Sequence, residues 1–379
     1  MIVLLSLILF LPNLNLTAAL SYGDGTDNCN WASSQTLAPR VFNCDSVNIG
    51  GAATISFSDS DYIIIRSQGD VVIDGDINLN ATGSTAGSGG GDGGVCAVAN
   101  SCNGIAADAK FGAHGRGGGM ATNGGGGGGS GGRFGSTLPT AGVQGDDTNL
   151  GGPAGAGASV PPSTYYPENN FENEFSGGTG GGAGGSGYDS ANYEIGGYGG
   201  GGGGGIIIIA KGSVTISGNI YVNGADGNDG SDAAGGQGGG GGGGGGSGGA
   251  VYIIGRDGVT ITGSISAIGG NQVASNGGSG NSVLDPGGNG GKGGDGKIRI
   301  DTPSGSYTGG ATTPVAYQST LPSITDPVNS SGGAADYESA ISPSCVYKEH
   351  SNFGLSFIFS LLTLLLILKI PKVFRRHQY

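Results

Sequence analysis

The strongest constraint on the fold is a strand pattern that occurs three times, with long glycine tracts between the copies. The copies span residues 62–79, 206–222 and 251–268, and each opens with four mostly apolar residues before shorter apolar runs. The second and third copies align position by position, with Ile216 over Ile261. A half copy at residues 297–300 follows the next glycine tract. A repeat of this length is typical of solenoid proteins.

Within each copy, apolar and polar residues alternate, as in Val214-Thr215-Ile216. Alternation with a period of two indicates a strand that buries one face. One copy cannot bury that face alone, whereas stacked copies can bury it against one another. The sequence therefore predicts a mainly β protein, a parallel β-helix or β-solenoid. We expect Ile73, Ile216 and Ile261 to point inward and to lie over one another.

An antiparallel sandwich built from hairpins is the alternative fold. Hairpins use turns of about two to five residues, and several connections between the repeat strands are far longer. These glycine-rich excursions span residues 80–205, 223–249 and 269–296, and we expect them to leave the solenoid from one corner. We expect partly ordered loops held by their apolar ends. Ordered polyglycine, in threefold left-handed helices that pack side by side, is the alternative.

Composition indicates three further parts of the chain: a cap, the solenoid and a stalk. Residues 22–52, which include Trp31, are expected to cap a solenoid at residues 53–303, because terminal repeats of a solenoid are atypical. Residues 304–352 contain a stretch rich in Ser, Thr, Pro and Gly, which indicates a stalk. Asn80-Ala81-Thr82 and Asn329-Ser330-Ser331 match the sequon for N-glycosylation, which matters only in a eukaryotic host.

Both termini carry apolar segments. Residues 1–21 predict a secretory signal peptide that is cut near Ala19 or Ser21. Residues 353–370 predict a transmembrane helix, and the basic residues of the tail at 371–379 place the C-terminus in the cytoplasm, a type I topology. A signal for a glycosyl-lipid anchor is the less favoured alternative, because such tails end apolar.

The order of a hydrophobic segment and a short basic tail resembles the C-terminal sorting signals of bacterial surface proteins. That resemblance implies a tail that is recognised and cut, after which the protein is displayed or released. Both interpretations place the bulk of the chain outside the cytoplasm, at the cell surface.

The five cysteines fit an oxidising compartment. In chain order we expect Cys29 to pair with Cys44 and Cys96 to pair with Cys102, which leaves Cys345 over. Zinc is the other use of such pairs, but the spacings do not match a ligand set and histidine is scarce.

The net charge and the glycine content of the chain limit the kinds of partner and fold that are expected. The formal net charge is −13, and an acidic surface repels phosphate backbones, so nucleic acid is not expected as a partner. The 90 glycines do not indicate collagen, because the chain has 14 prolines and no strict Gly-X-Y period. The expected partners are the membrane, through the C-terminal helix, and surface glycans or other cell-surface proteins.

One candidate site is acidic. Asp226, Asn228 and Asp232 lie close together with glycines between them, and oxygen ligands spaced in this way could hold Ca²⁺. A simple polar turn is the favoured alternative. No cofactor is expected apart from this calcium ion.

The second candidate site is aromatic. Tyr165, Tyr166, Phe171 and Phe175 lie among acids and amides within an otherwise glycine-rich region. Aromatic faces beside acids and amides suit sugar rings or a protein surface. The alternative is a small satellite core that pins the long excursion.

Catalysis has little support in the sequence. The chain has three histidines, and its Ser, His and acidic residues form no recognised catalytic arrangement. Solenoid enzymes that act on pectin-like sugars carry paired acids on one face. Here Asp146-Asp147 falls in an excursion, and Asp70, Asp74 and Asp76 lie on a single copy of the repeat.

Residues 53–300 resemble glycine-rich β-helix surface proteins, on the basis of the threefold pattern. This resemblance implies a non-enzymatic structural or adhesive protein of the cell surface. A carbohydrate-active β-helix enzyme, a lyase or hydrolase of extracellular polysaccharide, is the alternative. A protein that faces ice or mineral with flat polyglycine surfaces is a third class.

Overall fold

The computed structural model describes residues 20–38, 41–58, 61–95, 175–189, 192–232, 238–271, 286–322 and 324. All of them belong to the first of two compact units, Met1–Pro327. The predicted transmembrane segment and basic tail lie outside the described residues. Among the residues that are described, no helix is long and apolar enough to cross a membrane.

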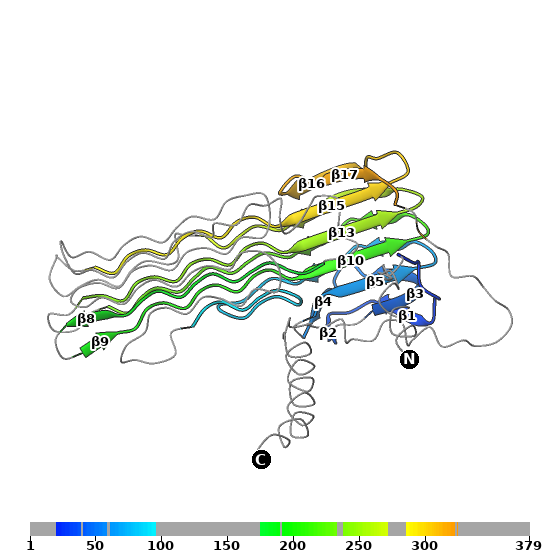
Figure 1. Ribbon diagram of the computed structural model, residues 1–379. Coiled ribbons are helices and arrows are strands. Elements are labelled where there is room, and N and C mark those ends of the chain that lie inside the picture. The colour runs from blue at the N-terminus through cyan, green and yellow to red at the C-terminus, as the bar shows by residue number, and fades with distance from the viewer. Residues whose placement is uncertain are drawn as a thin grey trace, which may run out of the picture. The chain divides into compact units, whose positions relative to one another are not determined.

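The described part is mainly β and is built around one sheet of 15 strands in which every strand pair is parallel (Figure 1). The sheet forms three ladders. The first contains β3 (Val41–Ile49), β5 (Ile63–Ser67), β10 (Gly205–Ala210), β13 (Ala250–Gly255), β15 (Lys297–Thr302) and β17 (Tyr317–Thr320). The second contains β1 (Asp27–Trp31), the end of β3, β6 (Val71–Ile73), β11 (Val214–Ile216), and the starts of β14 (Val259–Ser266) and β16 (Thr308–Thr313). The third contains β2 (Gln35–Leu37), β4 (Thr54–Phe57), β7 (Asp76–Asn78), β12 (Asn219–Tyr221) and the ends of β14 and β16.

Consecutive strands of the repeat belong to the first, second and third ladders in that order, and the next copy repeats this order. Ile216 is the register partner of Ile73 on one side and of Ile261 on the other, and all three side chains are fully buried. The predicted stacking of the three isoleucines is therefore confirmed. The parallel pairing rules out the sandwich of antiparallel hairpins for these strands. The arrangement is consistent with a parallel β-helix, although the sheet itself is not closed.

The interior of the coils holds a continuous apolar core that contains the inward Ile and Val residues of all three ladders. Near its first coils, Cys29 and Cys44 form a disulfide, which confirms that predicted pair. The ring of Trp31 packs edge-on against Phe42, with centroids 5.4 Å apart. Cys96, Cys102 and Cys345 lie outside the described residues.

A second apolar cluster lies on the outer face of the first ladder. Its centre is formed by alternate residues of β10 and β13, namely Ile207, Ile209, Tyr252 and Ile254, and Tyr22 and Phe175 cover them. These two strands are buried on both faces, which explains why their sequences are unbroken apolar runs. Beside them, the buried carboxylate of Asp301 pairs with Arg299 at 2.7 Å and accepts the hydroxyl of Tyr252 at 2.7 Å. A buried charge is tolerated when it is paired and hydrogen-bonded in this way.

Polar side chains join successive coils on the outside. A carboxylate or amide oxygen of the lower coil accepts a backbone N–H of the coil above, in the pairs Asp70–Ser213, Asp76–Asn219 and Asn80–Asn223. The backbone N–H and the hydroxyl of Ser213 both donate to Asp70, and these hydrogen bonds hold the pKa of its carboxyl below the usual value. Two of the three acids on the first copy of the repeat, Asp70 and Asp76, therefore act in coil stacking.

Replacing Ile216 with Asp should destabilise the folded chain by about 3–5 kcal/mol or more, because the carboxylate would be buried without a partner. Ser217→Asp is the matched control, since Ser217 is the next residue and is exposed. Thermal unfolding followed by circular dichroism measures both variants. Equal melting temperatures for the two would contradict the inward position of Ile216.

Candidate functional site

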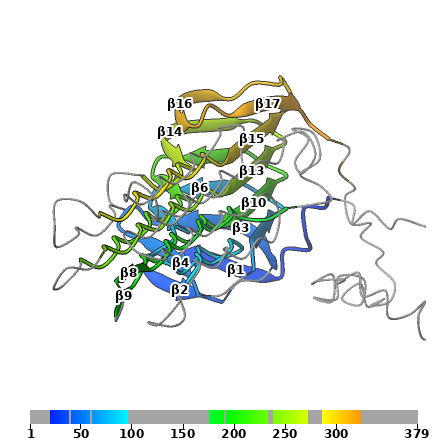
Figure 2. The same cartoon turned by 60° about the vertical axis from the view of Figure 1, so that its left-hand side comes forward.

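The described parts of the excursions run side by side, away from the strands, and both views show them parallel to one another (Figure 1, Figure 2). In the order of elements, each excursion follows a strand of the third ladder and precedes a strand of the first ladder. At the far end of two segments lie β8 (Gly187–Asp189) and β9 (Asn192–Glu194), an antiparallel pair. We term the segments together the glycine bundle: residues 80–95, 175–187, 192–204, 222–232, 238–249, 268–271 and 286–296.

Residues 238–249 lie at the centre of the glycine bundle, and all of them are buried. Their backbone N–H groups donate to three different neighbouring segments in a cycle of three residues. One set of donors faces residues 179–185: Gly241 to Gly185, Gly244 to Gly182 and Ser247 to Thr179. The next set faces residues 288–294: Gly242 to Gly288, Gly245 to Gly291 and Gly248 to Gly294. The last set faces residues 222–228: Gly243 to Asn228, Gly246 to Ala225 and Gly249 to Val222, and all nine distances are 2.7–2.9 Å.

This cycle identifies the backbone conformation. A polyproline II helix has three residues per turn and no internal hydrogen bonds, so successive N–H groups point to successive neighbours. The polyproline II conformation requires a negative φ. Among the described bundle glycines beyond residue 90, none has a positive φ. The described tracts are therefore ordered polyglycine helices, and lateral hydrogen bonds satisfy the backbone groups that the helix leaves open.

Close approach of the backbones explains why the tracts are glycine. A Cβ added at Gly227 would collide with the carbonyl oxygen of Gly243, and one added at Gly246 would collide with the carbonyl oxygen of Gly201. The same holds at Gly293 against Gly246. In each case the obstacle is backbone, which cannot swing aside as a flexible side chain can.

Residues 222–232 show how a tract with this period presents side chains. Three kinds of residue alternate on its three faces: Gly224, Gly227 and Gly230; Ala225, Asn228 and Ser231; and Asp226, Asp229 and Asp232. The glycine face packs against residues 240–246 of the central tract. The other two faces are largely exposed.

The acidic face joins tracts together. Asp226 accepts the backbone N–H of Asn271, and in a neighbouring tract Asp295 accepts that of Gly269 at 3.1 Å. Residues three apart on such a helix are separated by about 9 Å along the axis. Asp226 and Asp232 are six residues apart, so they are too far apart to ligate one Ca²⁺ at 2.3–2.6 Å. Among the described residues, no group of three or more acids, cysteines or histidines is placed to hold a metal ion.

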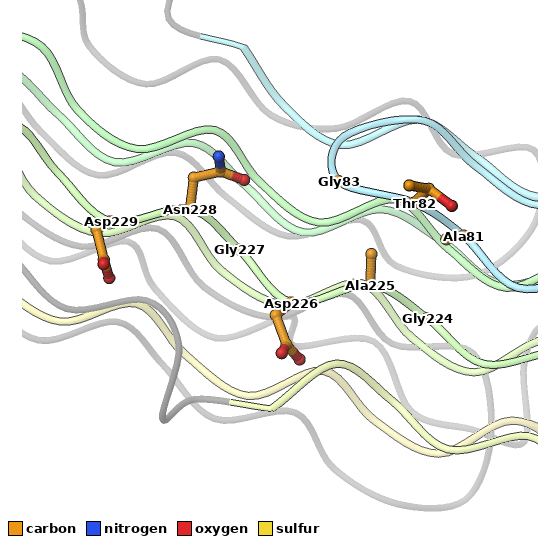
Figure 3. A pocket seen from close by; sticks show the side chains of 9 residues that line it. All are labelled: Ala81, Thr82, Gly83, Gly224, Ala225, Asp226, Gly227, Asn228 and Asp229. Carbon is orange, nitrogen blue, oxygen red and sulfur yellow. The ribbon is translucent and has the colours of Figure 1, made fainter.

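An open groove of about 580 Å³ lies between the acidic tract and the turn at residues 81–83. The turn is closed by reciprocal backbone hydrogen bonds between Thr82 and Thr85, with Gly83 at a φ of 56°. Figure 3 shows the side chain of Asn228 on the side of Thr82, whereas Asp226 and Asp229 point the opposite way. The residues that line the groove include Thr82, Asn228 and the acidic Asp226 and Asp229, so the groove is polar and suits a polar ligand.

The structure places one of the predicted aromatic contacts. Phe175 is 6 % exposed and its ring lies 5.3 Å from that of Tyr62, so it belongs to the second apolar cluster. This position favours the satellite-core alternative for Phe175. Tyr165, Tyr166 and Phe171 lie outside the described residues, and their role as ligand contacts stays a prediction.

No protein-family model, no curated protein and no solved structure matches this chain.

Replacing Gly227 with Ala should destabilise the glycine bundle by about 1–3 kcal/mol, as overpacking of a close contact does. Asn228→Ala is the control, because the neighbouring side chain is exposed and its loss should change stability by less than about 0.5 kcal/mol. Amide hydrogen exchange of residues 240–249 reads out the local effect. Unchanged protection in the Gly227 variant would show that the tracts do not pack as described.

Proposed function

We propose that this chain is a non-enzymatic protein of the cell surface, in which a parallel β-helix holds the glycine bundle as an adhesive or structural element. The observation that carries the proposal is the hydrogen-bonded order of the glycine bundle. Lateral backbone bonds fix long segments that have almost no apolar core of their own. A rigid backbone of this kind presents side chains at fixed spacing, which is what a binding surface needs.

The repeat copies support a role that depends on shape. Their buried positions are alike, as at Ile73, Ile216 and Ile261, whereas the exposed positions that follow carry Asp74, Ser217 and Thr262. A coil face that repeated a catalytic group would keep the same polar residue in each copy. The copies instead keep the residues that stack the coils.

Exposed groups on the glycine bundle indicate the kind of partner. Ile195 and Tyr198 are 36 % and 42 % exposed and lie three residues apart, on one face of their tract. The carbonyl of Tyr198 accepts the backbone N–H of Asn228, a residue that lines the groove. An exposed aromatic ring on such a tract suits a sugar or a protein surface. Surface glycans and other cell-surface proteins are therefore the proposed partners.

The disulfide between Cys29 and Cys44 supports an extracytoplasmic location, because such bonds persist in oxidising compartments. We place the bulk of the chain outside the cytoplasm, exported by residues 1–21 and held or processed at residues 353–370. The acidic net charge of −13 fits the expectation that nucleic acid is not a partner.

Deleting residues 353–379 should release the protein into the culture medium, because the apolar segment would no longer anchor it or direct its sorting. Immunoblots of medium and membrane fractions measure the distribution, and the full chain is the control. A truncated chain that stays in the membrane fraction at the level of the full chain would refute the C-terminal anchor.

The purified protein should bind an extracellular polysaccharide or glycan without breaking it. Tyr198→Ala should weaken that binding about tenfold, a typical loss for a contact aromatic. Val315→Ala, at a residue that is 85 % exposed outside the glycine bundle, should leave it unchanged. A glycan array measures binding and a reducing-sugar assay measures cleavage. Release of sugar would establish the carbohydrate-active enzyme instead, and absence of binding to any glycan or cell surface would overturn adhesion.

A further inference from the structure

Asn80 occupies the corner where the chain leaves the strands for the glycine bundle, two residues after β7. It opens the sequon Asn80-Ala81-Thr82, which neither the fold nor the proposed function explains. A sequon is used only when its asparagine amide is accessible and its chain segment is at the surface. The structure describes both the surroundings of the Asn80 amide and the position of the segment that follows it.

The amide nitrogen of Asn80 is available. The Oδ1 atom accepts the backbone N–H of Asn223 at 2.8 Å, and the residue's own backbone N–H donates to Asn78 at 3.1 Å. Within the described part of the chain, the Nδ2 group donates no hydrogen bond, and the residue is half-buried. Asn219, at the start of β12, instead uses both ends of its amide: Nδ2 donates to Asp76 and Oδ1 accepts from Ser264.

The segment that follows Asn80 is a surface turn. Thr82 and Gly83 are exposed, and the groove of about 580 Å³ opens beside them. Figure 3 shows the turn at the edge of this groove, with Asn228 across from it. A sugar attached at Asn80 therefore has space next to the attachment point, and polar groups line that space.

We propose that Asn80 is an N-glycan acceptor and that its first sugars lie at the groove beside the glycine bundle. The inference rests on the proposed export of the chain. The donor is a polyprenyl-diphosphate-linked oligosaccharide. The amide nitrogen of Asn80 forms a bond to the anomeric carbon, the bond from that carbon to the diphosphate oxygen breaks, and the amide loses one proton as the polyprenyl diphosphate leaves.

The folded structure tolerates this modification because the two ends of the amide have separate roles. Glycosylation changes Nδ2 and leaves Oδ1 as an acceptor, so the hydrogen bond from Asn223 persists. That bond belongs to a ladder, since Oδ1 of Asn223 in turn accepts the N–H of Ile268 at 2.8 Å. Substituting Asn80 itself would disturb the ladder, so the test must act through Thr82.

The test is expression of the full chain in eukaryotic cells, with the Asn80 peptide analysed by mass spectrometry before and after digestion with a peptide N-glycosidase. We expect a glycan on Asn80 that is lost in Thr82→Ala and kept in Thr82→Ser, which preserves the sequon. Asn329→Gln removes the second sequon, so any remaining mobility shift reports on Asn80. A secreted chain whose Asn80 peptide is unmodified overturns the proposal, as does a glycan found on Asn329 alone.

A second arm separates this proposal from the proposed location. In it, residues 1–19 are replaced by the signal peptide of a known secreted protein. If the native chain stays in the cytosol and the re-targeted chain carries a glycan on Asn80, export is wrong and the acceptor assignment stands. If the re-targeted chain is secreted with an unmodified Asn80, the acceptor assignment is wrong whatever the native location.

Discussion

The hydrogen bonds between neighbouring glycine backbones are the interaction on which the shape of the excursions depends. They form where the backbones approach without a Cβ between them: the N–H of Gly243 donates to the carbonyl of Asn228, and a Cβ on the adjacent Gly227 would collide with the carbonyl oxygen of Gly243. Polyglycine helices have no internal bonds, so a single tract in water would gain nothing from its order and would lose the large backbone entropy of glycine. The tracts are therefore stable only as a group.

The strands place the tracts for this contact. Three returning tracts run directly into β10, β13 and β15, which are paired neighbours in the first ladder. The pairing continues into the bundle: Gly205 opposes Ala250 in the sheet, and further out Gly200 donates to Gly244. Neighbouring strands lie about 4.7–4.9 Å apart, so the coil brings the tracts together at backbone distance before any bundle contact forms. The sheet and the glycine bundle thus share one register.

The parallel stacking of the copies could be predicted from the sequence, because the repeat aligns Ile73, Ile216 and Ile261 in phase. Parallel register follows from that alignment. The second apolar cluster was missed, although the unbroken runs at residues 206–209 and 251–254 mark strands that are buried on both faces. The order of the tracts stayed open for a physical reason: a flexible glycine loop and a packed polyglycine helix have the same composition. A local signal existed in the spacing of Gly224, Gly227 and Gly230.

The acidic segment at residues 226–232 shows that composition does not determine how far apart side chains lie. Asp226 and Asp232 look like clustered ligands when the segment is taken as a compact turn, whereas a helix with a rise of about 3.1 Å per residue spreads them along an edge. The groove could not be foreseen, because its two walls are about 140 residues apart in the chain and meet only through the stacking of the first and second copies.

Backbone N–H and C=O groups at the edges of the glycine bundle can pair with another chain, as those at the edge of a sheet can. Such pairing leads to aggregation. Sheets restrain this with charge at the edge, and the bundle carries carboxylates in that role. Asp226, Asp295 and Asp92 each accept a backbone N–H from another segment or turn, so one side chain both satisfies a donor and leaves a negative charge beside it. These acidic residues of the glycine bundle thus act at its edges, where they satisfy backbone donors and add negative charge.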